Sequence, residues 1–356
     1  MNNFEWLNQG IKEIPQAALD AAIARQNSLT KPPGSLGRLE EVAIRLAAMS
    51  ENGVPHLKRI KIVVFAADHG IAEENVSAFP QAVTAEMVKN FSAGGAAISV
   101  LADELEADLQ VINAGTVTEL EKMQGVLDQR VSAGTANFSI QAAMSEAQLS
   151  EAFQIGYQAV HKGLENKNHQ TVVDLFIAGD MGIANTSSAT AIVCALLGCS
   201  AKEIAGPGTG LDVSGLNHKV NIIQKSLDKH QLNPGKPLDI LQTVGGFEIA
   251  AMTSAYITCA QNNIPILVDG FISSVAALLA VKINPQVKSW MFFSHASAEP
   301  GHKKIMQEMQ AEPLIDLNLR LGEASGAAVV VPLMRLACAL HNKMATFEQA
   351  GVSNKE

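Results

Sequence analysis

The sequence predicts an α/β protein built on a doubly wound, mostly parallel sheet. Short β-rich runs alternate with longer helical patterns along the chain, which is the signature of parallel strands joined by crossover helices. Five runs read as strands, at residues 60–65, 109–112, 174–177, 264–268 and 289–293. We therefore expect one central sheet with helices packed on its faces.

Each of the five runs ends in polar or glycine residues. In chain order these ends are Asp68-His69-Gly70, Asn113-Ala114-Gly115, Gly179-Asp180-Met181-Gly182, Asp269-Gly270 and Ser294-His295. Ligands of open α/β sheets lie beyond the carboxyl ends of the strands, so five such ends predict one ligand crevice. The alternative is that βα loops are often polar and glycine-bearing without any ligand. The two histidines are interpreted as orienting hydrogen-bonders rather than catalysts.

Helical segments fill the intervals between the strands. We expect them at residues 16–29, 84–105, 144–165, 184–197 and 302–311. The second is predicted as a single helix, in which Gly94-Gly95 permits close packing against the sheet. After the first, Lys31-Pro32-Pro33-Gly34-Ser35 cannot continue a helix and forces an extended turn. Residues 353–356 are predicted to be a frayed tail.

Composition bounds the class of protein. Of the 356 residues, 47% are hydrophobic and 17% are charged, which fits a globular chain with room for one large domain and a smaller one. The net charge of −9 argues against nucleic acid as a partner, because nucleic-acid binding needs a basic face. The apolar windows are shorter than a membrane span of about 20 residues, so we expect no membrane partner either.

Cysteine usage and the first residues predict the compartment. Cys194, Cys199, Cys259 and Cys338 lie in apolar contexts without CxxC spacing or clustered histidines. This pattern indicates reduced core cysteines rather than disulfides or a zinc site. The N-terminus lacks the basic region and apolar stretch of a signal peptide. We expect a soluble, cytoplasmic protein without a bound metal.

One carboxylate has an unusual position in the chain. Glu323 lies between Gly322 and Gly326, just ahead of the mostly apolar run 327–340. The glycines allow a tight, closely approached turn. A carboxylate at the edge of a buried element is desolvated, which raises its pKa toward that of a usable general base. The competing interpretation is that Glu323 only complements the positive end of a helix.

Two glycine-rich stretches are suited to hold a phosphate. Residues 179–188 run from a strand end into a helix start, where backbone N–H groups can bind an anion. Residues 206–212 (GPGTGLD) form the second stretch, and Lys219 follows it with a point charge. Neither stretch is a dinucleotide fingerprint or a Walker loop. Together with Glu323, they predict a phosphorylated small molecule as the ligand.

Several motifs resemble those of the nicotinate-nucleotide:dimethylbenzimidazole phosphoribosyltransferases. They are KPPGSLGRLE at 31–40, ADHG at 67–70, DMGIANT at 180–186, GTGLD at 208–212, VGGFE at 244–248, VDGF at 268–271 and the segment around Glu323. The matches run in family order and with similar spacing from about Lys31 to about Leu340. The chain is identified as a member of this family.

The resemblance implies a reaction and an architecture. The family moves phosphoribose from nicotinate mononucleotide to dimethylbenzimidazole, which gives α-ribazole 5′-phosphate and nicotinate for the lower ligand of cobalamin. We expect a Rossmann-like α/β domain over residues 55–305 and a smaller helical domain from residues 1–54 and 306–356, which contributes the catalytic glutamate. The implied partners are the two small-molecule substrates and a second copy of the chain, and no cofactor is implied.

Catalytic roles carry over from the matching positions. Glu323 occupies the position of the family's general base. Asp180 stands where many members have Glu, and its side chain is shorter by a reach on the order of 1 Å. If this position assists proton transfer, Asp180 is expected to act through a water. Ala184 replaces a glycine that is common in the family, and a helix start is expected to tolerate it.

Binding roles carry over in the same way. The donor-phosphate side is assigned to Met181, Gly182, Ile183, Gly208 and Lys219. The base pocket is assigned to Phe79, Glu86 and Met87, where some members carry polar residues that hydrogen-bond the base. This departure leaves the acceptor open.

Two alternatives follow. The first is a related transferase or glycohydrolase that acts with adenine, another benzimidazole or a phenol. The second is a nucleotide-binding protein without turnover, which Asp180 and the altered base pocket favour and the intact motif around Glu323 opposes.

Overall fold

The computed structural model describes residues 4–164, 173–208 and 210–353. Thr209 of the second glycine-rich stretch therefore lies outside the described residues. The same holds for Glu165, the predicted end of one helix, and for residues 354–356 of the predicted tail.

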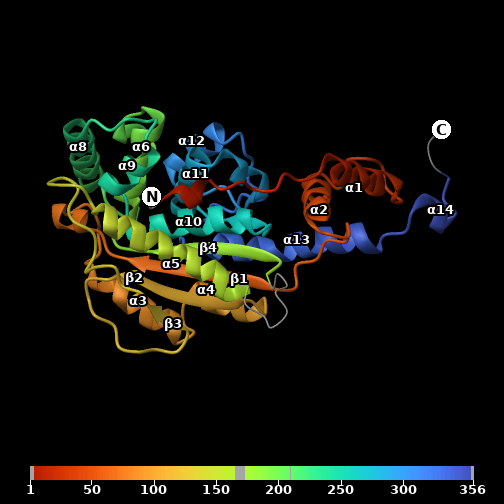
Figure 1. The fold of residues 1–356 in the computed structure, drawn as a ribbon, viewed down its shortest axis with the longest axis horizontal. Coiled ribbons are helices and arrows are strands. Elements are labelled where there is room, and N and C mark those ends of the chain that lie inside the picture. The colour runs from red at the N-terminus through yellow and green to blue at the C-terminus, as the bar shows by residue number, and fades with distance from the viewer. Residues whose placement is uncertain (1–3, 165–172, 209, 354–356) are drawn as a thin grey trace.

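The core of the molecule is a six-stranded parallel sheet with the strand order β3-β2-β1-β4-β5-β6 (Figure 1). The strands are β1 (Ile60–Ala67), β2 (Asp108–Gly115), β3 (Val126–Asp128), β4 (Leu175–Met181), β5 (Ile266–Val268) and β6 (Met291–Phe293). The chain builds outward from β1 in one direction and then from β4 in the other, so the topological switch lies between these two strands. This arrangement confirms the doubly wound α/β prediction.

All five predicted strands are present, and β3 is an addition. It has three residues, it pairs only with β2 at the edge of the sheet, and none of its side chains is fully buried. An edge strand this short has no apolar run of its own. Its existence depends on the neighbouring strand, which explains why the sequence did not indicate it.

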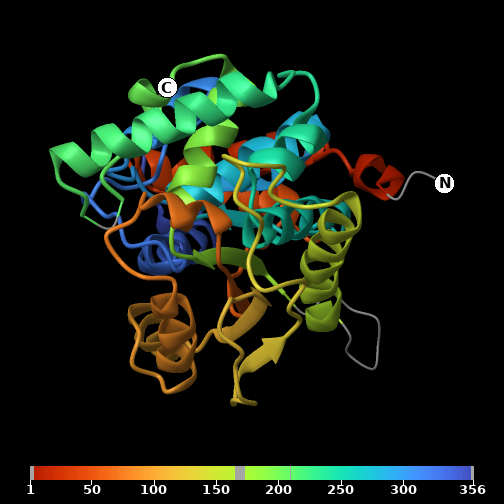
Figure 2. The ribbon, with the colours of Figure 1, turned by 90° about the vertical axis from the view of Figure 1, so that its left-hand side faces the viewer.

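Helices cover both faces of the sheet. The first face carries the larger buried cluster, which includes β-strand side chains and those of α5 (Glu146–Leu164), α6 (Asn185–Leu197), α7 (Ala201–Ile204), α8 (Val213–His230), α9 (Pro237–Val244), α10 (Phe247–Gln261), α11 (Phe271–Ile283), α12 (Pro300–Glu308), and the 3-10 turns η1 (Glu5–Asn8), η2 (Gly70–Glu74) and η3 (Pro285–Trp290). The opposite face is covered by α2 (Arg38–Met49), α3 (Ala82–Ser92), α4 (Ala97–Glu104) and α13 (Ser325–Lys343). In Figure 2, α8 lies at the opposite end of the molecule from α3 and α4.

The two chain ends meet away from the sheet. The helices α1 (Gln16–Ser28) and α14 (Phe347–Ala350) lie with α2 beyond one end of the sheet, and α13 runs from β4 to this group (Figure 1). The side chain of Arg25 in α1 donates hydrogen bonds to the carbonyl oxygens of His341 and Met344 at 3.2 and 2.9 Å. The N-terminal and C-terminal segments of the chain are thus joined through α13.

The prediction of one helix over residues 84–105 is wrong. The structure has two helices, α3 and α4, separated by Gly94 and Gly95. Gly94 has a φ of +79°, a left-handed conformation that interrupts the helix. The glycines thus end a helix rather than permit close packing within one. The other predicted helices are present with shifted ends, and α12 begins at Pro300 because proline is favoured in the first helical turn.

The helix α13 is both long and apolar. Of the helices within the described residues, it alone is long and apolar enough to cross a membrane by length and composition. Its apolar side chains at Ala327, Val330, Val331 and Met334 are buried against the sheet and its neighbours. A core helix passes the same test of length and composition, and burial explains the apolar character here.

Candidate active site

A cavity of about 290 Å³ lies at the carboxyl edge of the sheet, next to the switch point between β1 and β4. Six segments contribute to it, namely the loop before α3, the turn after β4, the loop before α8, the start of α11, the loop after β6 and the turn before α13. The lining residues are Phe79, Asp180, Met181, Gly182, Ile183, Asn185, Thr186, Gly208, Gly270, Phe271, Ile272, His295, Ser297, Glu299, Arg320, Leu321, Gly322 and Glu323. The strand ends after β4, β5 and β6 thus converge on one cavity.

The turn that carries Glu323, residues 320–326, is called the glutamate turn below. Gly322, Glu323 and Ala324 all have left-handed backbones, with φ values of 88°, 62° and 69°. A left-handed backbone costs a residue with a Cβ roughly 1–2 kcal/mol of conformational free energy, so tertiary contacts must hold this turn in place. Ala324 is the N-cap residue of α13 and offers no side-chain acceptor to the helix.

Two close backbone approaches fix the glutamate turn against the sheet. A Cβ at Gly179 of β4 would lie 2.5 Å from both Ala324 N and Glu323 C. A Cβ at Gly326 would lie 2.1 Å from the His295 ring. Glycine at these positions therefore lets the turn contact β4 on one side and the residue after β6 on the other.

The carboxylate of Glu323 is desolvated. Its residue is only 5% exposed, and its Oε2 has no hydrogen-bond partner among the described residues. Burial raises the pKa of Glu323 to about 7, and the nearby Asp269 carboxylate adds to the rise. A base with this pKa takes up a proton efficiently near neutral pH. The sequence prediction of a buried carboxylate is confirmed, whereas its catalytic role stays a prediction.

The turn between β4 and α6, residues 179–186, forms another wall of the cavity. Asp180 is 7% exposed, and its Oδ2 accepts a hydrogen bond from Asn185 Nδ2 at 2.8 Å. Burial raises the pKa of Asp180 well above its usual range, with further contributions from the carboxylates of Asp269, Glu248 and Glu323. The cavity thus holds several carboxyl groups that disfavour one another's ionisation.

The predicted phosphate residues of this turn reach the cavity with different atoms. Met181, Gly182 and Ile183 all line it. The backbone N–H of Ile183, however, donates to Thr84 Oγ1 at 3.1 Å, so it is already engaged within the protein. Ala184 has a φ of 72°, so alanine there is strained, and the expectation that this position tolerates alanine as an ordinary helix start is wrong.

Lys219 lies directly behind the cavity wall. It is 1% exposed, and its Nζ donates to Thr186 Oγ1 at 2.6 Å and to the Gly206 carbonyl at 3.4 Å. Burial lowers the pKa of Lys219 to about 8, and Glu299 opposes this shift. A Cβ at Gly208 would lie 3.5 Å from Lys219 Nζ, so the ammonium group is adjacent to a residue that lines the cavity.

The three residues predicted for the base pocket do not line the same cavity. Phe79 lines the cavity and is 50% exposed. Glu86 is exposed on α3, and Met87 is half-buried against the core cluster of the second face. Neither is among the residues that line the cavity. Their assignment to the base pocket stays a prediction that this cavity does not itself support.

His69 and Asp68 follow β1 and lie outside the cavity lining, where they connect the surrounding elements. The His69 Nε2 lies 2.7 Å from Glu248 Oε1, its Nδ1 lies 2.9 Å from Ser188 Oγ, and its ring is fully buried. The carboxylate of Asp68 accepts hydrogen bonds from Thr84 Oγ1 and from the Val117 backbone. These contacts tie β1 to α3, α6 and α10, which agrees with the interpretation of His69 as an orienting residue.

Sequence reasoning missed several functional candidates. Glu299 and Ser297 line the cavity from the loop after β6, and Asp269 lies behind it at the end of β5. Asp269 and His295 were visible as polar strand ends, but no spacing pattern linked them to Glu323. Glu299 precedes Pro300 at a helix start, and that weak capping signal gave no reason to place it in a cavity.

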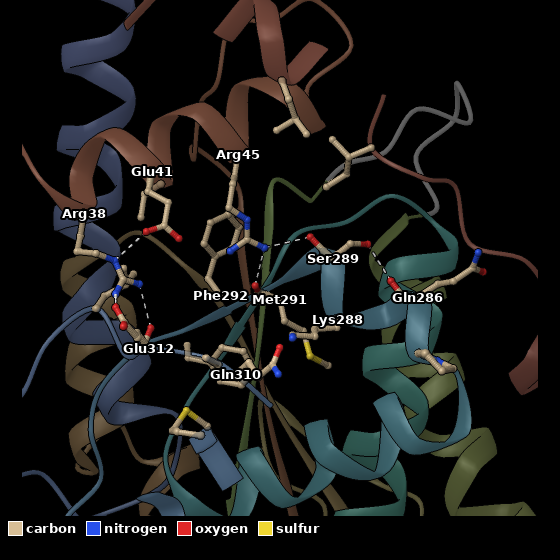
Figure 3. A pocket seen from close by; sticks show the side chains of 18 of the residues that line it. Arg38, Glu41, Arg45, Gln286, Lys288, Ser289, Met291, Phe292, Gln310 and Glu312 are labelled. Carbon is tan, nitrogen blue, oxygen red and sulfur yellow. Dashed lines mark hydrogen bonds and ion pairs between the residues drawn. The ribbon is translucent and has the colours of Figure 1, made fainter. Parts of the chain in front are cut away.

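A larger cavity of about 1220 Å³ lies elsewhere, between α2, the segment before α1, β6 and α12 (Figure 3). Its arginines are already engaged. Arg38 pairs with Glu41 and Glu312 at 2.9 and 2.7 Å. Arg45 donates to the carbonyl oxygens of Ser289 and Met291, and its guanidinium lies 4.1 Å from the Phe292 ring centroid. These contacts join α2 to residues around β6 and after α12. The arginines are thus used within the protein, so the larger size of this cavity does not identify it as the active site.

The fold and the small cavity together define a class of protein. It is an α/β protein with a cavity at the switch point of a doubly wound sheet, where a carboxylate with a raised pKa faces a wall backed by a buried lysine. Within the described residues, no group of three or more His, Cys, Asp or Glu side chains is arranged to hold a metal ion.

Comparison with known proteins gives the particular family. A family described as phosphoribosyltransferase matches residues 11–352. Nicotinate-nucleotide:dimethylbenzimidazole phosphoribosyltransferases from Pseudomonas putida (strain W619) and Xanthomonas campestris pv. campestris (strain B100) are 51% and 50% identical to the chain, with 99% of each chain covered. The chain belongs to this phosphoribosyltransferase family and is a glycosyl-transferring enzyme.

A solved structure agrees with the computed fold. The crystal structure of CobT from Thermus thermophilus is 40% identical and superimposes with a TM-score of 0.90, covering 95% of this chain and 100% of its own. The fold and the family predicted from the motifs are therefore confirmed along essentially the whole chain.

Proposed function

We propose that this enzyme transfers phosphoribose from nicotinate mononucleotide to dimethylbenzimidazole in cobalamin biosynthesis, giving α-ribazole 5′-phosphate and nicotinate. The observation that carries the proposal is the desolvated Glu323 carboxylate, with a pKa of about 7, at a cavity on the carboxyl edge of the sheet. The names and full-length similarity of the relatives support the choice of substrates.

The reaction needs few groups, which suits this cavity. The bond from ribose C1′ to the pyridinium nitrogen breaks, and nicotinate leaves as its ring becomes neutral. A nitrogen of the azole attacks C1′ from the opposite face, so one direct displacement inverts the anomeric centre. The azole N–H proton passes to Glu323 and then to solvent. General-base catalysis of this kind contributes about 10²–10⁴ in rate, and alignment of the two substrates supplies the rest.

The donor binds along the turn after β4. Its phosphate lies toward Met181, Gly182 and Gly208, with the positive charge of Lys219 behind them. Thr186 takes part because its hydroxyl receives the Lys219 hydrogen bond and its residue lines the cavity. In an acidic protein, this buried cation supplies the local attraction that a broad positive field does not.

Asp180 serves as the second catalytic group. It lines the cavity opposite the glutamate turn, and a Cβ at Gly322 would lie 3.4 Å from its Oδ2. Because burial and neighbouring carboxylates raise its pKa well above the usual range, Asp180 carries a proton more readily than an exposed carboxyl. It hands protons on through a water, since its side chain is short.

The acceptor base lies against Phe79 at the cavity edge. The flat aromatic ring, with Met181 and Leu321 nearby along the lining, offers apolar contact to a planar base. Glu86 and Met87 complete this pocket only if α3 approaches the cavity when the base binds.

The enzyme works in the cytoplasm as a homodimer. Each chain has two domains, one of residues 55–305 and one of residues 1–54 together with 306–356. On α13, Val329, Leu333 and Leu336 are 37%, 38% and 56% exposed and recur at helical spacing, so they form an apolar stripe. Such a stripe is suited to a partner subunit. Sedimentation of the purified protein tests this, and a Leu336→Lys variant is expected to be monomeric.

The test of the reaction is nicotinate release from nicotinate mononucleotide, with and without dimethylbenzimidazole, followed by mass analysis of the product. Release that requires the base and yields α-ribazole phosphate supports the proposal. Release with adenine, another benzimidazole or a phenol instead keeps the mechanism and changes the acceptor. Release with water alone indicates a glycohydrolase. Binding of the mononucleotide without release under any of these conditions indicates a protein without turnover.

A further inference from the structure

The start of α13 lacks a cap of its own. Its N-cap residue is Ala324, which has no side-chain acceptor, although the N–H groups of a first helical turn need one. Asp269, which follows β5 and lies 58 residues before Ala327 in the chain, supplies it. Its Oδ1 accepts from the Ala327 backbone N–H at 2.7 Å.

The same carboxylate contacts the residue that follows Glu323. The backbone N–H groups of Ala324 and of the adjacent Gly270 also favour the ionised form of Asp269, against the larger effect of burial, which raises its pKa. Asp269 therefore holds the first turn of α13, directly after Glu323 and Ala324, whose left-handed conformations are disfavoured by the local sequence.

One carboxylate oxygen of Asp269 makes no hydrogen bond with the described residues. The carboxylate is fully buried, and its Oδ2 has no hydrogen-bond partner among the described residues. A nearby group that can carry a positive charge is His295, whose Nδ1 lies 3.8 Å from Asp269 Oδ1 and 3.0 Å from Ser294 Oγ. The His295 ring in turn packs on Gly326 of the glutamate turn.

We propose that Asp269 is the positioning residue of Glu323: it caps α13 from the neighbouring strand and thereby places a like charge beside the Glu323 carboxylate. This inference rests on the proposed function, in which Glu323 accepts the proton of the base. It assigns two separable effects to one side chain. The hydrogen bonds hold the glutamate turn, and the charge decides at which pH Glu323 ionises.

Several other charged groups face Glu323 and define its surroundings. They come from each element packed around the turn, namely Asp180 after β4, His295 after β6, Glu299 before α12, Arg320 in the glutamate turn itself and Glu248 on α10 behind Asp180. Of the charged neighbours, Asp269 contributes most, after burial itself, to the raised pKa of Glu323. Burial raises the pKa of Asp269 itself, whereas His295 and the backbone N–H groups of Ala327, Gly270 and Ala324 favour its ionised form.

The two effects are separated by two substitutions. Asp269→Asn keeps an oxygen that accepts from Ala327 and removes the charge, whereas Asp269→Ala removes both. For Asp269→Asn, we expect the acid limb of the pH profile of kcat to move down by about one pH unit, because the nearby Asp269 carboxylate disfavours the ionised form of Glu323 and neighbouring charges shift a carboxyl pKa by about 1–3 units. KM for nicotinate mononucleotide should stay unchanged. Asp269→Ala should lose activity at every pH and melt several degrees lower.

A second readout does not depend on catalysis. Native Glu323 has a pKa of about 7 against an ordinary value of 4.5, so its ionisation lowers stability as the pH rises from 4.5 to 7. Glu323→Gln should therefore raise Tm at pH 8.5 more than at pH 5.5. This pH-dependent gain should be smaller in the Asp269→Asn background. Asp239→Asn is the matched control, since that carboxylate lies in the exposed first turn of α9 and, among the described residues, forms its ion pair with Lys236.

The outcomes separate the two claims. If the acid limb is unmoved in Asp269→Asn and the Tm gains are equal in both backgrounds, the role of Asp269 is overturned while the base role of Glu323 stands. If Glu323→Gln turns over nearly normally, the base role fails, and the Tm comparison alone then decides whether Asp269 sets the ionisation of Glu323. The inference is supported if the acid limb shifts in Asp269→Asn and the Tm gain from Glu323→Gln is smaller in the Asp269→Asn background.

Discussion

The two walls of the cavity are built in different ways. The turn after β4, residues 179–186, is organised mainly by neighbours in the chain, as when Asn185 binds Asp180 and the Asn185 N–H binds the Gly182 carbonyl. The glutamate turn is held by distant residues, namely Asp269 on its helix start, Gly179 on its backbone and His295 on Gly326. The first wall is therefore a local structure and the second a tertiary one. Substitutions should affect them differently.

The largest effect is expected at Glu323. Glu323→Gln should lower kcat by about a hundredfold or more, because the azole proton loses its acceptor, while nicotinate mononucleotide still binds. Steady-state kinetics and direct binding of the mononucleotide measure the two parts. Near-normal turnover in this variant would remove Glu323 as the base and leave the second wall with a structural role only.

The first wall should respond through binding. Lys219→Met should raise KM for nicotinate mononucleotide on the order of tenfold to a hundredfold, since hydrogen bonds to charged groups contribute about 1.5–3 kcal/mol. Lys225→Met is the control, because Lys225 is exposed on the same helix, α8. An unchanged KM in Lys219→Met would separate this lysine from the donor phosphate.

The pH profile of kcat/KM should report both walls at once. Glu323 must be ionised, so activity should fall about tenfold per unit below its pKa of about 7. Lys219 must be protonated, so activity should fall again above its pKa of about 8. Lys219→Arg should remove the alkaline fall, because arginine stays charged throughout this range. An alkaline limb that persists in Lys219→Arg would belong to another group.

The close contact of Gly179 in the first wall with the glutamate turn can be disrupted by adding one Cβ atom. In Gly179→Ala, the new Cβ would meet Ala324 N and Glu323 C at 2.5 Å. Overpacking of this kind destabilises by about 1–3 kcal/mol, and the displaced glutamate should also lower kcat. Thermal unfolding and kinetics measure both. Gly10→Ala, where nothing lies within 4 Å, should change neither.

The smallest effect is expected from relieving strain in the first wall. Ala184→Gly removes a Cβ from a residue with a φ of 72° and should stabilise the protein by up to about 1 kcal/mol. The greater freedom of glycine in the unfolded chain offsets part of this gain. Ala189→Gly within the same helix is the control and should lower Tm. A lower Tm in Ala184→Gly as well would show that the left-handed alanine carries no strain.

Much of the architecture was predictable because it depends on local patterns. The runs that became β1, β2 and β4 are apolar over several residues, and their polar ends indicated the edge at which the cavity lies. The edge strand β3 was not predictable, since its three residues depend on pairing with β2. The break between α3 and α4 was not predictable either, because Gly94-Gly95 is compatible with close packing or with interruption of a helix, and the left-handed φ of Gly94 decides between them.

Local sequence is enough to place the strand ends, the glycine turn after β4, and Glu323 beside flexible glycines ahead of an apolar helix. Each of these follows from residues adjacent in the chain. Packing in three dimensions, by contrast, determines that Asp269 caps α13, that Lys219 lies behind Thr186, and that Glu86 and Met87 do not line the cavity. The physical reason is that pKa shifts and helix caps of this kind arise between groups on different elements, whose separation in space is set by the packing of the whole sheet.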